Sequence, residues 1–149
     1  MRRPTLRGAK CVLTDGPAVL LVRHTYGRRH WDLPGGKVER GEEPIVAGRR
    51  EMLEELGLEI DYWQPLGEIE VVADHRNDTL FAFHAEVSAP ELTVQLAEIQ
   101  EVRWFDRSDL PVPIAKHARR IIARLPQFAG PPLGGPPPPG APPPKPPPP

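Results

Sequence analysis

Apolar and polar residues alternate in blocks near the start of the chain, and the first two blocks predict a hairpin. Residues 6–13 are largely apolar and are followed by the turn-forming residues 15–17. Residues 18–22 then form an apolar run without a polar interruption, which is typical of a strand buried on both faces. Arg23 ends this second strand.

A helical pattern follows at residues 44–56. Pro44 suits a first helical turn, where its missing N–H has no partner within the helix. Gly57 suits the position just past the last turn. Four apolar residues recur at helical spacing and predict one buried stripe: Ile45, Met52, Leu53 and Leu56.

Strand-like patterns return after this helix. They cover residues 67–72, 79–87 and 101–105, with a polar loop at 73–78 between the first two. Residues 113–125 predict a second helix with apolar residues on one side. Strands on both sides of a central helix, with another helix at the end, predict an α/β domain in which helices pack on a mixed sheet.

The end of the chain has a different composition. From Ala129 onward the chain contains only Pro, Gly, Ala, one Leu and one Lys. Such a segment cannot bury a core and favours a solvated, partly polyproline II chain. The sequence therefore predicts one domain over residues 1–128 and a disordered proline-rich tail over residues 129–149. Docking of this tail on a proline-recognition domain is the alternative.

Composition and charge narrow the class of protein. A chain of 149 residues favours one domain with one core. The formal net charge of −1 disfavours a nucleic-acid partner. No stretch approaches the roughly 20 apolar residues of a membrane helix, and the first ten residues lack the apolar run of a signal peptide. The single cysteine, Cys11, predicts a buried thiol in a strand, so we expect a soluble protein in a reducing cytoplasm.

Three carboxylates lie on one face of the predicted helix. Glu51, Glu54 and Glu55 stand at i, i+3 and i+4, and like charges at these spacings destabilise an isolated helix by a few tenths of a kcal/mol per pair. A hard divalent cation would remove the repulsion, and oxygen ligands of this type suit magnesium or manganese. The alternative is an ordinary solvated charged face.

The full pattern around these carboxylates decides between the two. It reads Gly36, five residues, Glu42, seven residues, Arg50-Glu51, Met52, any residue, Glu54-Glu55, any residue, Gly57 and Leu58. The chain here resembles the Nudix hydrolases, whose box is G-x5-E-x7-R-E-U-x-E-E-x-G-U, where U is a bulky aliphatic residue. All nine specified positions are filled, and the preceding Leu33-Pro34-Gly35 is also similar. The resemblance covers about residues 5–125 and implies an α/β/α sandwich around a mixed β-sheet.

The resemblance also implies roles for the residues of the box. Glu51 and Glu55 become the main metal ligands, Glu54 becomes a further or water-mediated ligand, and the carbonyl of Gly35 completes the shell. The implied cofactor is Mg²⁺, with Mn²⁺ as the alternative. Glu54 or Glu51 is the candidate general base, with Arg50 positioning the carboxylates.

Residues outside the box complete the candidate site. The resemblance implies that Arg23 contacts a substrate phosphate, for which an arginine fork is suited. Arg28 could add positive charge, or could belong to a solvated loop. Some family members use a carboxylate from a distant loop, and here Glu98 or Glu101 could serve; a surface charge is the alternative for each. Trp31 could stack on a base, but packing under the sheet is the favoured use.

The implied activity is magnesium-dependent hydrolysis of a phosphoanhydride bond in a small nucleotide. Short loops near residues 72–79 favour a nucleoside di- or triphosphate or a nucleotide sugar. Members specialised for ADP-ribose often carry a proline about sixteen residues after the box. This chain has Ala73-Asp74-His75 there, without proline, which disfavours ADP-ribose as the substrate. The alternatives are an ADP-ribose or dinucleoside polyphosphate pyrophosphatase, and a nucleotide-sensing module without catalysis. The oligomeric state is not readable from the sequence.

Overall fold

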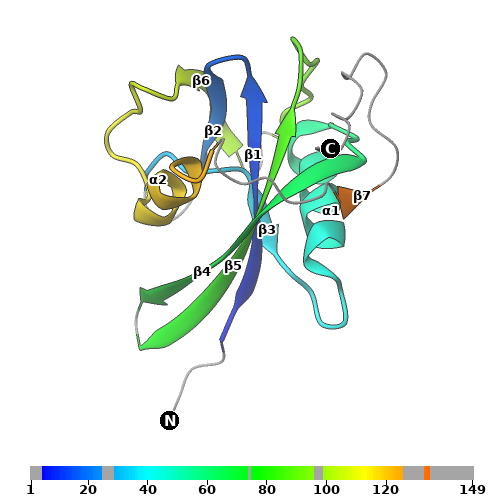
Figure 1. The fold of residues 1–149 in the computed structure, drawn as a ribbon, viewed down its shortest axis with the longest axis vertical. Helices are drawn as coiled ribbons and strands as arrows, with labels where there is room; N and C mark the ends of the chain where they lie inside the picture. Colours follow the sequence, from blue (N-terminus) through cyan, green and yellow to red (C-terminus); the bar gives the residue numbers. More distant parts are fainter. Residues whose placement is uncertain (1–4, 25–28, 74, 96–98, 126–132, 135–149) are drawn as a thin grey trace, which may run out of the picture.

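A mixed sheet with one helix on each face forms the body of the protein (Figure 1). The computed structural model describes residues 5–24, 29–73, 75–95, 99–125 and 133–134. The elements, in chain order, are β1 (Arg7–Asp15), β2 (Ala18–His24), β3 (Gly35–Lys37), α1 (Pro44–Leu56), β4 (Tyr62–Ala73), β5 (Arg76–Glu86), β6 (Ile99–Asp106), α2 (Lys116–Ile122) and β7 (Leu133–Gly134). The strands are ordered β6-β2-β1-β5-β4-β7, with β3 paired to β1. The pair β1–β5 is parallel and the others are antiparallel, which confirms the predicted mixed sheet.

Strand β1 changes partner along its length, and this change creates space for the loop before α1. Next to the hairpin turn β1 pairs with β2, at Thr14 and Asp15. Toward its start β1 pairs instead with β3, where Ala9 lies opposite Gly36. On the other side Asp32 exchanges two backbone hydrogen bonds with Val22 of β2, of 2.8 and 2.9 Å. The segment from Asp32 to Gly36 is therefore held by both β1 and β2.

Apolar side chains fill both faces of the sheet and form two separate cores. Along β1 successive side chains point to opposite faces, so Ala9, Cys11 and Leu13 belong to the core under α1, and Val12 belongs to the core under α2. Residues 19–22 of β2 are fully buried, as the unbroken apolar run predicted. No helix in the described part of the chain is long and apolar enough to cross a membrane.

The bounds of α1 are those predicted, but its buried face is different. Pro44 stands in the first turn, and Gly57 adopts the left-handed conformation with φ +67°. The N–H of Gly57 donates to Leu53 O, which closes the last turn. Met52 and Leu56 are buried as predicted, but Leu53 is 53% exposed, so its place in the buried stripe was wrong. The small residues of α1, Ala47 and Gly48, are buried.

The second helix begins later than predicted because the backbone of Trp31 forms hydrogen bonds with the residues just before it. Trp31 N donates to Pro113 O at 3.0 Å, and Ala115 N donates to Trp31 O at 2.8 Å. These bonds form a bridge to Ile114, so the helix begins only at Lys116.

The β4–β5 hairpin is longer than predicted. Ala73 pairs with Arg76, so residues 76–78, predicted as loop, belong to β5. Strand β4 begins at Tyr62 and not at Gly67 as predicted. Pro65 and Gly67 normally weaken a strand, but a register shift between them lets the pairing with β5 continue through both residues.

Candidate active site

Two consecutive glycines bring the loop before α1 against the rest of the site. Gly35 has φ +143°, and a Cβ there would overlap the carbonyl oxygen of Ala9 on β1. A Cβ on Gly36 would overlap the carboxyl group of Glu51. Glycine is therefore required at position 35 for the loop to lie against β1, and at position 36 a side chain would displace the Glu51 carboxyl group.

Glu51 and Glu55 lie side by side on the face of α1 that meets this loop. Glu55 is buried, and its Oε2 accepts a hydrogen bond from Gly35 N at 3.3 Å. Burial, and after it the charge of Glu51, raise the pKa of Glu55 to about 8. The bond from Gly35 and the nearby Lys10 act in the opposite direction. The pair is therefore two neighbouring carboxyl groups, of which Glu55 holds its proton more tightly than a free carboxyl group does.

Arg50 is the hydrogen-bonding centre of the box. Its guanidinium forms a two-bond fork with Glu42, of 2.9 and 3.0 Å. It also donates to Glu51 Oε1 at 2.9 Å, to Lys37 O at 3.0 Å and to the more exposed Glu54 at 3.4 Å. The bonds to Arg50, and then the backbone bond from Glu39, lower the pKa of Glu42 to about 2. One side chain thus connects the loop with all the acidic residues of the helix except Glu55.

The donor set at this site fits a hard divalent cation. The carboxyl groups of Glu51 and Glu55 offer oxygen ligands, which magnesium and manganese prefer. Within the described residues no three His, Cys, Asp or Glu side chains are grouped to hold a metal. Proteins usually bind magnesium through one or two carboxylates, and water and substrate oxygens complete the coordination shell.

Arg23 lies next to the last residue of β2 and is already paired. It forms an ion pair with Glu101, which lies opposite it on β6, and its guanidinium lies 4.7 Å from the ring centroid of Trp31. Its Nε is buried and has no hydrogen-bond partner among the described residues. Glu101 also bonds Arg103 at 3.1 Å. Any phosphate that reaches Arg23 must therefore compete with Glu101.

The structure brings together most, but not all, of the predicted site residues. Gly35, Arg50, Glu51, Glu54 and Glu55 lie together at the glycine loop, and Arg23 with Glu101 forms a second group at the β2–β6 pair. The remaining two predicted residues, Arg28 and Glu98, lie outside the described residues. Trp31 is buried and packs edge-on against Phe105 at 4.8 Å, which is the packing use that the sequence favoured.

The sequence did not predict one polar network near the site. Asp32 accepts hydrogen bonds from Lys10 Nζ at 3.0 Å and from Leu33 N at 2.7 Å, and its Oδ1 lies 2.8 Å from His117 Nε2. The Lys10 charge and the His117 bond outweigh burial and hold the pKa of Asp32 well below its usual range. No local pattern relates Asp32 to His117, which is 85 residues away. The network ties α2 to the loop that carries Gly35.

The family of the protein follows from this fold and this box. A model of the NUDIX domain matches residues 4–125, nearly the range that the resemblance covered, and the chain belongs to the Nudix family.

Individual relatives agree with this assignment. The chain is 34% identical over 111 residues to an ADP-ribose pyrophosphatase of Mycobacterium tuberculosis, covering 71% of this chain and 50% of the relative. It is 36% identical over 105 residues to an oxidized purine nucleoside triphosphate hydrolase of Danio rerio, covering 67% and 65%. The chain thus spans less than two thirds of each of these relatives. Its fold matches the crystal structure of a MutT NUDIX hydrolase from Burkholderia pseudomallei with a TM-score of 0.76 at 23% identity, covering 83% of this chain and 99% of that one.

Proposed function

We propose that this protein is a magnesium-dependent hydrolase that cleaves a phosphoanhydride bond in a nucleotide. The observation that carries the proposal is the close pair of the buried Glu55 and the largely buried Glu51 beside the glycine loop, within a complete Nudix box. Burial and the neighbouring Glu51 oppose ionisation of Glu55, and a divalent cation bound between the two carboxyl groups would favour the ionised pair.

The residues of the box would have separate roles in metal binding, positioning and proton transfer. Glu51, Glu55 and the Gly35 carbonyl would hold the cation, which supplies charge neutralisation of the diphosphate and activation of water. Arg50 would keep Glu51 in place through its 2.9 Å bond. Glu54 is the favoured general base, because its side chain is 58% exposed and can pass a proton to solvent. Glu51 is the alternative base.

The substrate class is a nucleoside di- or triphosphate, or a nucleotide sugar. The tight β4–β5 hairpin, in which Ala73 pairs with Arg76, supports a compact ligand site. The similarity to an oxidized purine nucleoside triphosphate hydrolase supports the same class. The similarity to an ADP-ribose pyrophosphatase favours ADP-ribose as the second candidate. A dinucleoside polyphosphate is a third.

The test is release of phosphate and nucleotide from a panel of these compounds, with magnesium, with manganese and with chelator. We expect cleavage of one class only when metal is present, and Glu54→Gln and Glu51→Gln should each remove it. Tight binding of a nucleotide without cleavage under any metal condition would replace the proposal by a nucleotide-sensing module.

Two further parts of the proposal concern the whole chain. The catalytic domain would span residues 1–128, with residues 129–149 as a tail outside its cores. The buried Cys11 thiol, whose pKa is raised mainly by burial, supports a location in a reducing cytoplasm.

A further inference from the structure

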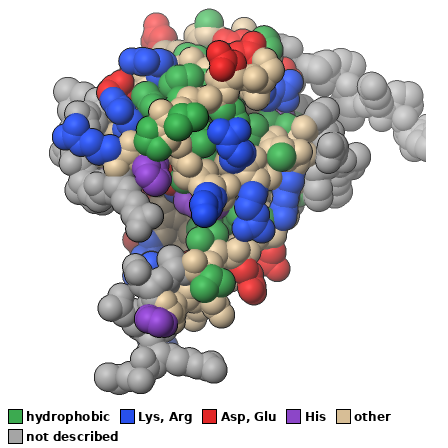
Figure 2. Space-filling model, turned by 90° about the vertical axis from the view of Figure 1, so that its left-hand side faces the viewer, with side chains coloured by type: hydrophobic (Ala, Val, Ile, Leu, Met, Phe, Trp, Pro, Cys, Tyr) green, Lys and Arg blue, Asp and Glu red, His purple; other side chains and the backbone are tan. Residues whose placement is uncertain are grey.

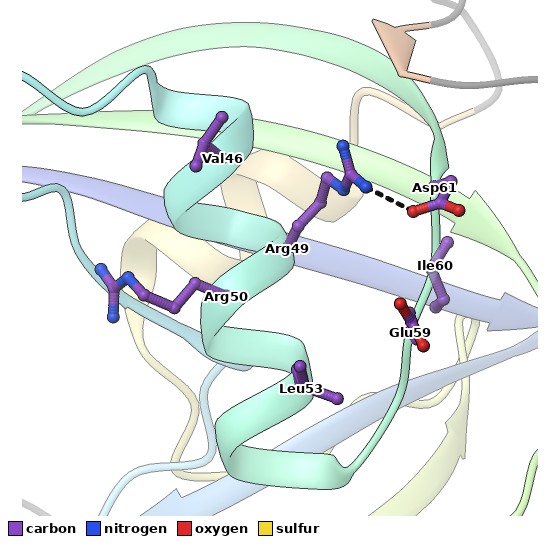
Figure 3. Close-up of a pocket in the computed structure, with 7 residues that line it drawn as sticks. All are labelled: Val46, Arg49, Arg50, Leu53, Glu59, Ile60 and Asp61. Atoms are coloured by element: carbon purple, nitrogen blue, oxygen red, sulfur yellow. Dashed lines mark hydrogen bonds and ion pairs between the residues drawn. The ribbon is translucent and has the colours of Figure 1, made fainter.

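A groove of about 340 Å³ lies beside α1 and is lined by apolar residues and by the charged side chains of Arg49, Arg50, Glu59 and Asp61 (Figure 3). It separates the helix from residues 59–61, which lead into β4. Val46 and Leu53 line it from the helix and are 47% and 53% exposed, and Ile60 lines it from the other side. The Arg49–Asp61 ion pair spans it (Figure 3). Val46 and Leu53 thus offer this groove apolar side chains that the rest of the described structure leaves half exposed.

The register of β7 identifies the segment that is directed into this groove. Strand β7 pairs antiparallel with the start of β4, with Leu133 opposite Trp63 and Gly134 opposite Tyr62. In an antiparallel ladder the numbers of one strand rise as those of the other fall. β7 therefore runs in the direction of Asp61, Ile60 and Glu59, which are the groove residues that precede β4.

The sequence of that segment fits the groove in length. Residues 136–139 are four consecutive prolines. A polyproline II helix rises about 3.1 Å per residue, so four prolines span roughly 12 Å. Val46 and Leu53 are seven residues apart on α1, which corresponds to roughly 10 Å along the helix axis.

The segment also fits the groove in chemistry. Proline offers carbonyl acceptors and no N–H donor, so its binding surface must supply donors and apolar contacts. Arg49 uses Nη2 for Asp61 and has further N–H groups for such carbonyls. Val46, Leu53 and Ile60 supply the apolar contacts for the rings. We propose that residues 136–139 bind this groove of their own chain as a polyproline II helix lying along α1.

The first experiment uses the full-length chain with residues 136–139 replaced by Gly-Ser-Gly-Ser. The methyl NMR signals of Val46, Leu53 and Ile60 should move, while those of the exposed Val72 and Val112 elsewhere stay in place. The same replacement at residues 146–149 is the matched control and should move none. Adding a synthetic peptide of residues 135–149 at about millimolar concentration should return the groove signals to their wild-type positions. The wild-type chain, whose groove is filled, should respond at least about tenfold more weakly.

The second experiment changes the groove and observes the tail. In the wild-type chain the amides of Gly140 and Ala141 should relax like those of the domain, because the preceding prolines are bound. Leu53→Asp should give them the relaxation of a free chain, and Val112→Asp, which also places a carboxylate at an exposed apolar position, should not. Identical groove signals in the wild-type chain and in the chain with residues 136–139 replaced would overturn the proposal. Groove signals that move with protein concentration would also overturn it, since they would indicate a second copy as the occupant.

Discussion

Replacing Arg50 should cost far more stability than replacing its neighbour Arg49. Arg50→Ala removes the partner of Glu42 and Glu51, whose side chains are each only 13% exposed. Charged hydrogen bonds contribute about 1.5–3 kcal/mol each when buried, and discounting for solvent screening leaves about 2–3 kcal/mol for the whole set. Arg49 pairs with Asp61, and both side chains are more than 40% exposed, so Arg49→Ala should cost about 0–1 kcal/mol.

Thermal unfolding in the presence of a chelator measures this difference without a contribution from bound metal. For a domain of this size 1 kcal/mol corresponds to about 3–5 °C, so Tm should fall by about 6–15 °C in Arg50→Ala and by less than about 5 °C in Arg49→Ala. Arg50→Lys keeps the charge but loses the two-bond fork to Glu42, and should lie between the wild type and Arg50→Ala. Equal losses in Arg49→Ala and Arg50→Ala would refute the reasoning that Arg50 connects the loop with the helix.

Three further predictions concern the box and the opposite side of the sheet. Glu51→Gln should abolish turnover while far-UV circular dichroism stays unchanged; turnover at the wild-type rate would remove the assigned role. Gly36→Ala should lower both magnesium affinity, measured by calorimetry, and turnover, because its Cβ overlaps the Glu51 carboxyl group; wild-type affinity would contradict the close approach. Burial lowers the pKa of His84 to about 4, so between pH 6.5 and pH 4 the unfolded chain binds more protons than the folded one, and the free energy of unfolding should fall as pH falls through this window. His84→Gln should flatten this part of the curve in denaturant titrations, and an unchanged slope would speak against the buried, neutral ring.

Proline and glycine residues at the ends of elements, and unbroken apolar runs, made some elements predictable from the sequence. The bounds of α1 follow from Pro44 and Gly57, which act through backbone geometry and need no tertiary information. The buried strand at residues 19–22 follows from its apolar run. The carboxylates were found because the box fixes their spacing. The structure places Glu51 and Glu55 beside the glycine loop, and Glu54 bonds Arg50 from a more exposed position.

Tertiary contacts decided the rest. The start of α2 depends on Trp31, whose backbone bonds the chain at Pro113 and Ala115. Leu53 carries the helical period of a buried residue, yet it faces the groove rather than the sheet. Arg23 meets Glu101 only because β2 pairs with β6, which no local pattern reports.

The division of the interior into two cores has a consequence for how this protein can change. The box helix packs on one core, and α2 packs on the other, with the sheet between them. Substitutions in separate, non-touching clusters tend to have additive effects. The α2 side carries several arginine and lysine side chains (Figure 2), and of the α2 residues His117 is the one bonded to Asp32 in the loop that carries Gly35. Substitutions elsewhere in the core under α2 should therefore add to substitutions in the core under α1, so that each half of the interior can vary one residue at a time.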